Sequence, residues 1–330
     1  MDIHSLKETA SQRLSTAREE KYIILIYAGI TVGFSALVTV INYLANNGIA
    51  QTGGLSNIGL RSVLYTLQQI LPMLQSLVLM IMELGLANAT LRIARNQYAS
   101  AHSLRMGADR FFQLIRCMVA QGFLYFLVGM VTFSLAVQIY LFTPLSNTAM
   151  EILTPLLADR SALSGSTLTL SAETAWQLAE AMIPMFILFG VLCAAVCIPL
   201  MYQFRMVNYV LIDNPRLGGR AVLKESRKIM RKHCLQLFKL DLSFWWYYLL
   251  LLIVGFLCYG ETWLALAGIS LPFSGDVSFF FFYVLFLAAT VAVYYFFRNP
   301  VEVTYALFYE QFKPKEEQDN AVVLGNIFQM

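Results

Sequence analysis

The sequence predicts an all-α membrane protein, a polytopic bundle of six transmembrane helices, and three observations support this prediction. Of the 330 residues, 58% are hydrophobic and only 13% are charged, and the mean hydropathy is +0.63. Soluble domains average about 45–50% apolar and about 25% charged residues. A soluble chain of this composition would therefore expose too much apolar surface. The other two observations are six long apolar runs and a one-sided distribution of positive charge.

Each apolar run is long enough for a membrane span, which needs about 20 mostly apolar residues. The expected spans are 22–45, 62–87, 114–142, 176–207, 242–270 and 277–298. The first run is too long for a cleavable signal peptide and lacks a small-residue cleavage pattern. Outside the spans we expect an N-terminal amphipathic helix over 1–21, a basic amphipathic segment over 216–240 and a tail over 311–330, so that the whole chain forms a single membrane domain.

Positive charge lies almost entirely on one side of the predicted membrane. All but two of the 23 lysines and arginines fall in the N-terminal region, around the ends of spans two and four, and from the end of span six onward; the exceptions are Arg61 and Arg160. Cytoplasmic loops carry the excess of Lys and Arg, so both termini are expected in the cytoplasm. An odd number of spans would destroy this sorting of charge.

Two stretches of the chain resemble each other. The matching segments are 95–97 with 213–215 and 112–116 with 235–239, each pair followed by an apolar span. Spans two, four and six also end in an Asn followed by Gln or Pro, at Asn96, Asn214 and Asn299. Asn tolerates the left-handed conformation of a helix C-cap, and Pro does not easily continue a helix. The likeness is either a parallel duplication or a product of this shared helix-end chemistry.

Residues 220–240 predict a basic amphipathic helix. Apolar and small residues recur at three- and four-residue steps from Val222 to Leu240, which is typical of a helix. The remaining positions include Lys224, Arg227, Lys228, Arg231 and Lys232. Such a helix lies under the inner leaflet, where each cation near anionic headgroups contributes roughly 1 kcal/mol. The same pattern equally suits a helix that only packs under the bundle and follows the charge rule. A nucleic-acid partner is not expected, because no basic domain with interleaved aromatics faces water.

Four polar side chains inside the spans are candidates for an intramembrane polar site: Glu83, Arg205, Gln68 and Gln75. Measured from the span ends, Glu83 and Arg205 differ in depth by about 6 Å, which permits an ion pair. Ionisable residues within a membrane are functional candidates, although both lie near enough to the surface to snorkel. The pair is either structural or part of a transport path. The two glutamines face other helices, where they either line a solute path or fill the centre of the bundle.

No catalytic signature occurs in the sequence: there is no HExxH, Walker A, GxSxG or dinucleotide fingerprint. Cys193 and Cys197 share a helix face, but they have no His or carboxylate partners nearby, so we expect no metal site. Gly29 and Gly33 form a GxxxG pattern, a chance-prone indication of a close helix contact. We therefore expect a protein that is not an enzyme and has no cofactor.

Four motifs along the chain are informative when they are taken together. They are Leu6-Lys7 to Arg18; Leu91-Arg92-Ile93-Ala94-Arg95 with Phe111; Tyr209-Val210-Leu211-Ile212-Asp213-Asn214-Pro215 with Ala221, Ser226-Arg227, Met230, His233 and 237–244; and Ala306-Leu307-Phe308-Tyr309-Glu310. The chain resembles the domain of unknown function 975, a family of uncharacterised bacterial integral membrane proteins. It departs from the family pattern at Gln97, where a Gly or an acidic residue is usual, and in its longer outer segments. The resemblance implies a multi-pass protein of the bacterial cytoplasmic membrane and assigns no activity.

Our leading hypothesis is a non-enzymatic membrane protein that acts through its cytoplasmic face. It would bind anionic lipid headgroups of the inner leaflet or a membrane protein partner, in membrane assembly, regulation or envelope homeostasis, through the cations of 216–240. The alternative is a transporter of a small solute or a lipid, with Glu83, Arg205 and the glutamines of span two along its path.

Overall fold

The computed structural model consists of helices throughout the elements that it describes, which confirms the predicted all-α class. The described residues are 3–17, 19–51, 58–158, 172–266, 268 and 275–313. Arg160 and the expected tail beyond Lys313 lie outside them. Contacts divide the chain into two compact units, unit 1 (Met1–Ile115 with Met206–Met330) and unit 2 (Arg116–Arg205).

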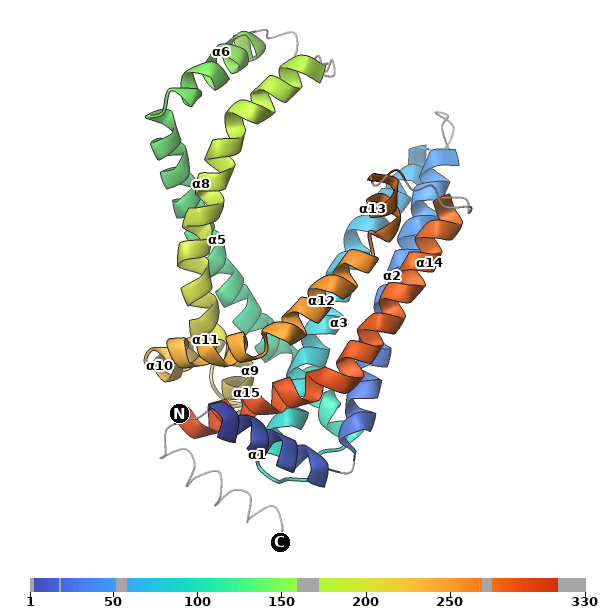
Figure 1. The fold of residues 1–330 in the computed structure, drawn as a ribbon, viewed down its shortest axis with the longest axis vertical. Coiled ribbons are helices and arrows are strands. Elements are labelled where there is room, and N and C mark those ends of the chain that lie inside the picture. The colour runs from blue at the N-terminus through green and yellow to red at the C-terminus, as the bar shows by residue number, and fades with distance from the viewer. Residues whose placement is uncertain are drawn as a thin grey trace. The chain divides into compact units, whose positions relative to one another are not determined.

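Unit 1 combines helices from both ends of the chain (Figure 1). Its N-terminal part contains α1 (Ile3–Thr16), α2 (Glu20–Gln51), α3 (Ile58–Ala94), the 3₁₀ helix η2 (Ala101–Arg105), α4 (Met106–Asp109) and the start of α5 (Phe111–Leu141). Its C-terminal part contains α9 (Val207–Asp213), α10 (Gly219–Met230), α11 (Cys234–Ser243), α12 (Trp245–Leu257), α13 (Gly260–Leu266), α14 (Gly275–Val293), the π-helical turn η3 (Tyr294–Arg298) and α15 (Asn299–Phe312). Because α15 packs against both α1 and α3, the two ends of the chain form one body.

The apolar core of unit 1 lies where α1, α2, α3 and α15 meet. Its buried members are Ala10, Leu14, Ile23, Ile24, Tyr27, Met82, Leu86, Ala89, Ile93, Ala99, Leu104 and Val303. Ala10 and Leu14 come from the weakly amphipathic N-terminal segment, so α1 is an integral part of this body. Burial of such side chains is the main favourable term in packing a helix against its neighbours.

Unit 2 contains the rest of α5, α6 (Leu145–Ala158) and α8 (Ala172–Phe204). A small buried cluster joins Tyr140 of α5, Ala149 of α6, and Ala181 and Met185 of α8. The Tyr140 hydroxyl donates a hydrogen bond of 2.8 Å to the carbonyl oxygen of Ala181. Most other large apolar side chains on α5 and α8 are exposed, as expected for helices that face lipid.

Five helical segments are long and apolar enough to cross a membrane, which makes this a multi-pass membrane protein. They are Glu20–Asn46, Ser62–Ala94, Phe111–Leu141, Trp176–Asp213 and Val277–Phe312. A sixth span exists if α11 and α12, which meet at an angle of 63°, are counted as one. Five of the six predicted spans correspond to continuous segments, and the predicted fifth span falls on the bent α11–α12 pair.

The prediction of an unbroken fifth span over 242–270 is wrong. The chain bends at Phe244 and breaks again between Leu257 and Gly260. At the bend, the carbonyl oxygen of Ser243 accepts a hydrogen bond of 2.8 Å from Lys7 Nζ. That carbonyl would otherwise accept the next bond of the helical ladder. The Ser243 hydroxyl also bonds back to the carbonyl of Leu240 at 2.6 Å, an interaction that bends helices.

The prediction of one continuous helix over 220–240 is also wrong, because α10 and α11 are separate helices joined by a turn. His233 fixes this turn. Its ring stacks on the ring of Phe312 with centroids 3.8 Å apart, and its Nδ1 lies 2.9 Å from Gln236 Oε1. A contact with α15, far along the chain, therefore decides where the basic segment breaks.

The three Asn residues expected at helix ends behave differently from one another. Only Asn96 takes the left-handed conformation, with φ of 56°. Asn214 follows α9 with φ of −118°, and Asn299 is helical with φ of −58°. The helix continues past Asn299 because Pro300 falls in the first turn of α15, where a missing N–H is tolerated.

Two glycines allow backbones to meet in unit 1. A Cβ added to Gly85 of α3 would overlap the carbonyl oxygen of Leu104, and one added to Gly107 of α4 would overlap that of Ile81. By contrast, a Cβ added to Gly29 or Gly33 would meet no atom within 4 Å. The close approach therefore lies between α3 and the η2–α4 segment, and the GxxxG pattern of α2 makes no such contact within the described chain.

We expect Gly85→Ala and Gly107→Ala each to lower the apparent melting temperature of the detergent-purified protein by several degrees. Overpacking of this kind costs about 1–3 kcal/mol, and each kcal/mol shifts the melting temperature by about 2–4 °C in a chain of this order of size. Gly33→Ala is the matched control and should leave the melting temperature unchanged or slightly raised. Equal melting temperatures for all three variants would contradict the close approach.

Candidate functional site

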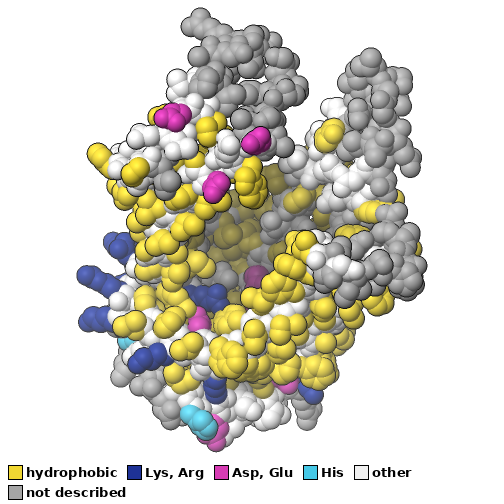
Figure 2. Space-filling model, turned by 45° about the horizontal axis from the view of Figure 1, so that its top comes forward, with side chains coloured by type: hydrophobic (Ala, Val, Ile, Leu, Met, Phe, Trp, Pro, Cys, Tyr) yellow, Lys and Arg dark blue, Asp and Glu magenta, His cyan; other side chains and the backbone are white. Residues whose placement is uncertain are grey.

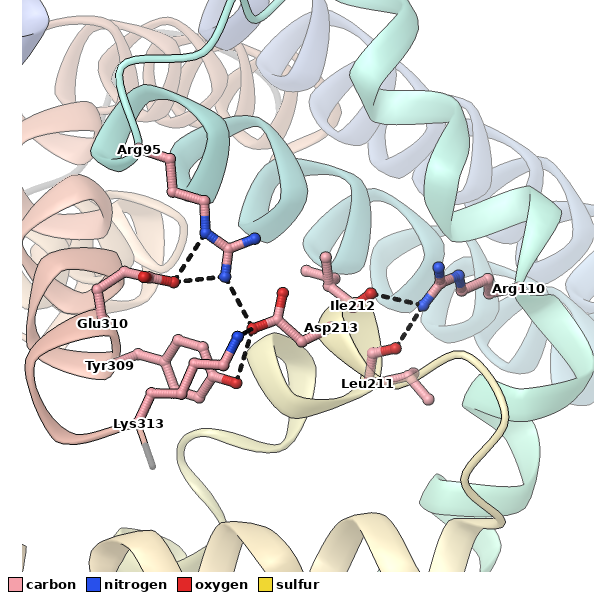
Figure 3. Close-up of polar contacts among 8 residues, drawn as sticks. All are labelled: Arg95, Arg110, Leu211, Ile212, Asp213, Tyr309, Glu310 and Lys313. Atoms are coloured by element: carbon pink, nitrogen blue, oxygen red, sulfur yellow. Dashed lines mark hydrogen bonds and ion pairs between the residues drawn. The ribbon is translucent and has the colours of Figure 1, made fainter. Parts of the chain in front are cut away.

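A buried ionic cluster gathers at one end of unit 1, centred on Asp213 (Figure 3). Asp213 Oδ2 accepts hydrogen bonds from Arg95 Nη2 and Lys313 Nζ, each at 2.7 Å, and from the Tyr309 hydroxyl at 3.0 Å. Arg95 Nε also donates to Glu310 Oε1 at 2.8 Å. The side chains of Asp213 and Lys313 are 8% and 3% exposed. Two cations face two anions, so the cluster is balanced in charge.

The cluster ties together the ends of three helices. Arg95 follows the last residue of α3 and precedes the left-handed Asn96. Asp213 is the last residue of α9, and the remaining members lie in or just after the last turn of α15. Burial alone would lower the pKa of Arg95, but its hydrogen bonds and charge interactions with Asp213 and Glu310 outweigh burial and raise that pKa. Arg95 is therefore a permanent positive charge at the centre of the cluster.

Arg110 and Gln113 hold the same region from a second direction. Arg110 Nη1 donates to the carbonyl oxygen of Leu211 and, at 2.9 Å, to that of Ile212. Gln113 Nε2 donates to the carbonyl oxygen of Pro215. The last carbonyls of a helix lack partners within the helix, and Arg110 supplies them for α9. Burial lowers the pKa of Arg110, and the nearby charge of Asp213 opposes that effect.

The two similar segments of the sequence meet in this cluster. Arg95 and Asp213 occupy equivalent positions in the matching stretches 95–97 and 213–215, carry opposite charges, and form the central ion pair. Three of the four motifs that suggested the family each contribute at least one member of the cluster. In the sequence these residues stand out only as parts of the family motifs and were not predicted as a site. The charged positions within the three motifs are the signal from which the cluster could have been predicted.

A second polar network surrounds Arg298, which is 7% exposed and lies at the end of the π-helical turn η3. Its Nη2 is 2.6 Å from Glu83 Oε1, and its guanidinium carbon lies 4.5 Å from the ring centroids of both Tyr27 and Tyr294. The Tyr27 hydroxyl donates to the same Glu83 oxygen at 2.7 Å. Glu83 thus has a partner that the sequence analysis did not assign to it. Arg205 belongs to unit 2, and its pairing with Glu83 stays a prediction.

The two glutamines of the second span are hydrogen-bonded to α2. Gln68 Nε2 donates to Asn46 Oδ1 at 2.6 Å, and Gln75 Nε2 donates to Ser35 Oγ at 3.1 Å. They form polar ties between α2 and α3. Their role in a solute path stays a prediction.

The cations expected as lipid or partner contacts lie on an exposed face. The buried face of α10 contains Val222, Ser226, Ile229 and Met230. Its exposed cations, with those of the following turn, are Arg220, Lys224, Arg227, Lys228, Arg231 and Lys232. Figure 2 shows several Lys and Arg side chains along the left edge of the view. Lys228 is 3.2 Å from Glu225 in an exposed i,i+3 pair, an interaction that contributes little to stability.

An open pocket of about 540 Å³ lies beside the cluster, between α1 and the residues that follow α3. Its lining includes Arg13 and Thr16 of α1, and Asn96, Gln97 and Tyr98. The described residues contain no group of three or more His, Cys, Asp or Glu side chains placed to hold a metal ion. The five cysteines are free thiols, and Cys193 and Cys197 lie 3.5 Å apart at their sulfur atoms.

The fold and this site define a multi-pass membrane protein whose helix ends are joined by buried ion pairs. The family model described as Protein of unknown function (DUF975) matches residues 1–316, so the chain belongs to that family, as its motifs predicted. Comparison with curated proteins and with solved structures gives no match.

We expect Asp213→Asn to destabilise the protein strongly, by about 3–5 kcal/mol, because it leaves the charges of Arg95 and Lys313 buried without their shared anion. Glu225→Gln is the matched control, since it removes one carboxylate from an exposed pair worth about 0.2–1 kcal/mol at most. Thermal unfolding in detergent measures both effects. Equal stability of the two variants would show that the cluster does not hold the three helix ends.

Proposed function

We propose that this protein is a non-enzymatic component of the bacterial cytoplasmic membrane that acts through its cytoplasmic face. It binds anionic lipid headgroups there, or a membrane protein partner, and serves membrane assembly, regulation or envelope homeostasis. The observation that supports this proposal is the cationic stripe of α10, which we define as Lys224, Arg227 and Lys228 of the helix with Arg231 directly after it. The excess of Lys and Arg around this helix supports a cytoplasmic location for it.

The arrangement of the cationic stripe favours binding of an anion from outside the protein. Its members recur at three- and four-residue steps, so they share one face of the helix. The opposite face is buried against the rest of unit 1, so the helix cannot rotate about its axis and the charged face stays exposed. Like charges at this spacing repel by about 0.2–0.5 kcal/mol per pair, and Glu225 is the one acidic residue within α10. An anionic leaflet removes this repulsion, since each cation near such a surface gains about 1 kcal/mol.

The ionic cluster positions the cationic stripe. Helix α10 begins six residues after Asp213 and packs against α9. Asp213 is fixed by Arg95 and Lys313, while Arg110 and Gln113 hold the backbone on either side of it. The stripe is thus presented by a rigid support, which reduces the ordering cost of binding.

We expect the triple variant Arg227→Glu/Lys228→Glu/Arg231→Glu to retain about 100-fold less anionic lipid than the wild type. The loss of three favourable contacts of about 1 kcal/mol each corresponds to about two powers of ten in affinity. The measurement is native mass spectrometry of the full-length protein, extracted gently and titrated with phosphatidylglycerol or cardiolipin.

The control reverses the same number of exposed charges elsewhere in unit 1, with Lys21→Glu/Arg92→Glu/Arg105→Glu. This variant should keep most of the lipid. If both triple variants lose lipid equally, net charge and not the cationic stripe determines binding. A retained protein in place of lipid would identify the partner, and a protein that holds neither would contradict the proposal.

A second candidate function is transport of a small solute or a lipid, and the network around Arg298 favours it. Glu83 and Arg298 form an ion pair between two apolar helical segments, Ser62–Ala94 and Val277–Phe312. The pair lies at a π-helical turn, a feature frequently found at functional sites. The Glu83 side chain remains 43% exposed, so one of its edges is open to a ligand or a proton.

If the protein is a transporter, Glu83→Gln should reduce flux in proteoliposomes at least tenfold while the protein still folds. The amide keeps the shape of the side chain but removes the charge that pairs with Arg298. Glu302→Gln is a matched control, since Glu302 is 3.6 Å from Arg298 in an i,i+4 pair within its own helix. Flux no greater than in empty vesicles, across a broad panel of solutes and labelled lipids, would count against this candidate.

A further inference from the structure

Helix α11 has two apolar faces, and only one of them is covered. Leu237 and Leu240 are fully buried against unit 1. The other face carries large apolar side chains at three-, four- and three-residue steps, continuing into the first residue of α12. We call these residues the apolar stripe of α11: Leu235, Phe238, Leu242 and Trp245, which are 76%, 50%, 59% and 60% exposed.

The orientation of α11 is fixed by contacts at its junction with α12. The two helices meet at 63°, and α12 has the apolar composition of a membrane span. Lys7 Nζ bonds to the Ser243 carbonyl at 2.8 Å and lies 4.0 Å from the ring centroid of Phe244. On the inner side of the junction, the Tyr305 hydroxyl bonds to Asp241 Oδ1 at 2.5 Å. If α12 follows the membrane normal, α11 lies closer to the membrane plane than to the normal.

Cations flank the apolar stripe. Lys239 of α11 is exposed, as is Lys232 in the turn before the helix. Lysine side chains at such positions place their charge among headgroups while their carbon chains cover apolar surface. An exposed apolar face bordered by Lys, with aromatic residues on it, is the pattern of a helix that lies in the membrane interface.

We propose that α11 is an interfacial helix whose apolar stripe is inserted at the boundary between lipid headgroups and acyl chains. The stripe leads directly into α12, which has the apolar composition of a membrane span, so we expect lipid around its Trp245 end. A second copy of the chain is a poor occupant, since stable protein interfaces bury about 800 Å² per partner, more than one face of a ten-residue helix offers. This proposal extends the proposed function from headgroup charge to acyl-chain contact. Insertion of α11 does not require that the cationic stripe of α10 binds headgroups, so the two can be tested separately.

The test uses two photoactivatable lipids on the wild-type, full-length protein in nanodiscs of phosphatidylethanolamine and phosphatidylglycerol. One lipid carries a diazirine near the top of its acyl chain, and the other carries it on the headgroup. After irradiation, mass spectrometry maps the adducts. We expect the acyl probe to label the apolar stripe at a level similar to exposed span residues such as Phe123 and Val131, and at least tenfold more than Lys228.

The double variant Leu235→Gln/Phe238→Gln should lose most acyl-probe adducts on α11 and keep those on Phe123. Absence of acyl-probe adducts on the wild-type stripe would overturn the proposal, and this arm does not depend on any variant folding. Chemical cross-links between the α11 helices of two copies would also overturn it. Acyl adducts on α11 with no headgroup adducts on α10 would support this proposal while the lipid-binding function failed.

Discussion

The buried carboxylate of Asp213 is the constraint on which unit 1 depends. A buried charge is tolerated only when it is paired and hydrogen-bonded, and Asp213 receives Arg95 from the end of α3 and Lys313 from the end of α15. Removal of either cation would leave a negative charge in the cluster buried without its full compensation. Three helices that are distant in the sequence are therefore held together at Asp213 Oδ2. Helix α10 packs against α9, so the position of α10 depends on the same contacts.

The sequence predicted the class of fold and the approximate spans because these follow from composition and the length of apolar runs. It failed where a distant contact decides a local conformation. Asn299 looks like a helix end, yet its side chain donates a hydrogen bond of 3.0 Å to the Glu20 carbonyl and it remains helical. The fifth span looks continuous in the sequence, yet Lys7 donates a hydrogen bond to the Ser243 carbonyl oxygen and the helix bends there. Cap and helix preferences are worth about 1 kcal/mol or less, so one tertiary hydrogen bond can reverse them.

The candidate site was predicted in part. The exposed cations of α10 follow from helical spacing alone, since an amphipathic pattern assigns each residue to a face. The partners of the ionic cluster do not follow in this way: Arg95 lies 118 residues from Asp213 and 215 from Glu310. Glu83 was assigned a nearby cation by its distance from the span end, but its observed partner is Arg298 of another span, which lies directly at the end of that span. Position counted along the spans did not identify this pair, because the packing of the helices decides which side chains meet.

The neighbouring helices α10 and α11 would contact the membrane through different forces, α10 through charge and α11 through apolar area. Attraction between the cationic stripe of α10 and anionic headgroups is screened over about 10 Å at 0.1 M salt. Insertion of the apolar stripe of α11, as proposed, would depend on buried apolar area, which salt does not screen. Helix α11 is joined to α10 by a three-residue turn fixed by His233 and Phe312, so an inserted α11 would keep the cationic stripe within reach of the headgroups. In the arrangement that we propose, the apolar contact would set the distance from the membrane, and the charged contact would set which lipids gather there.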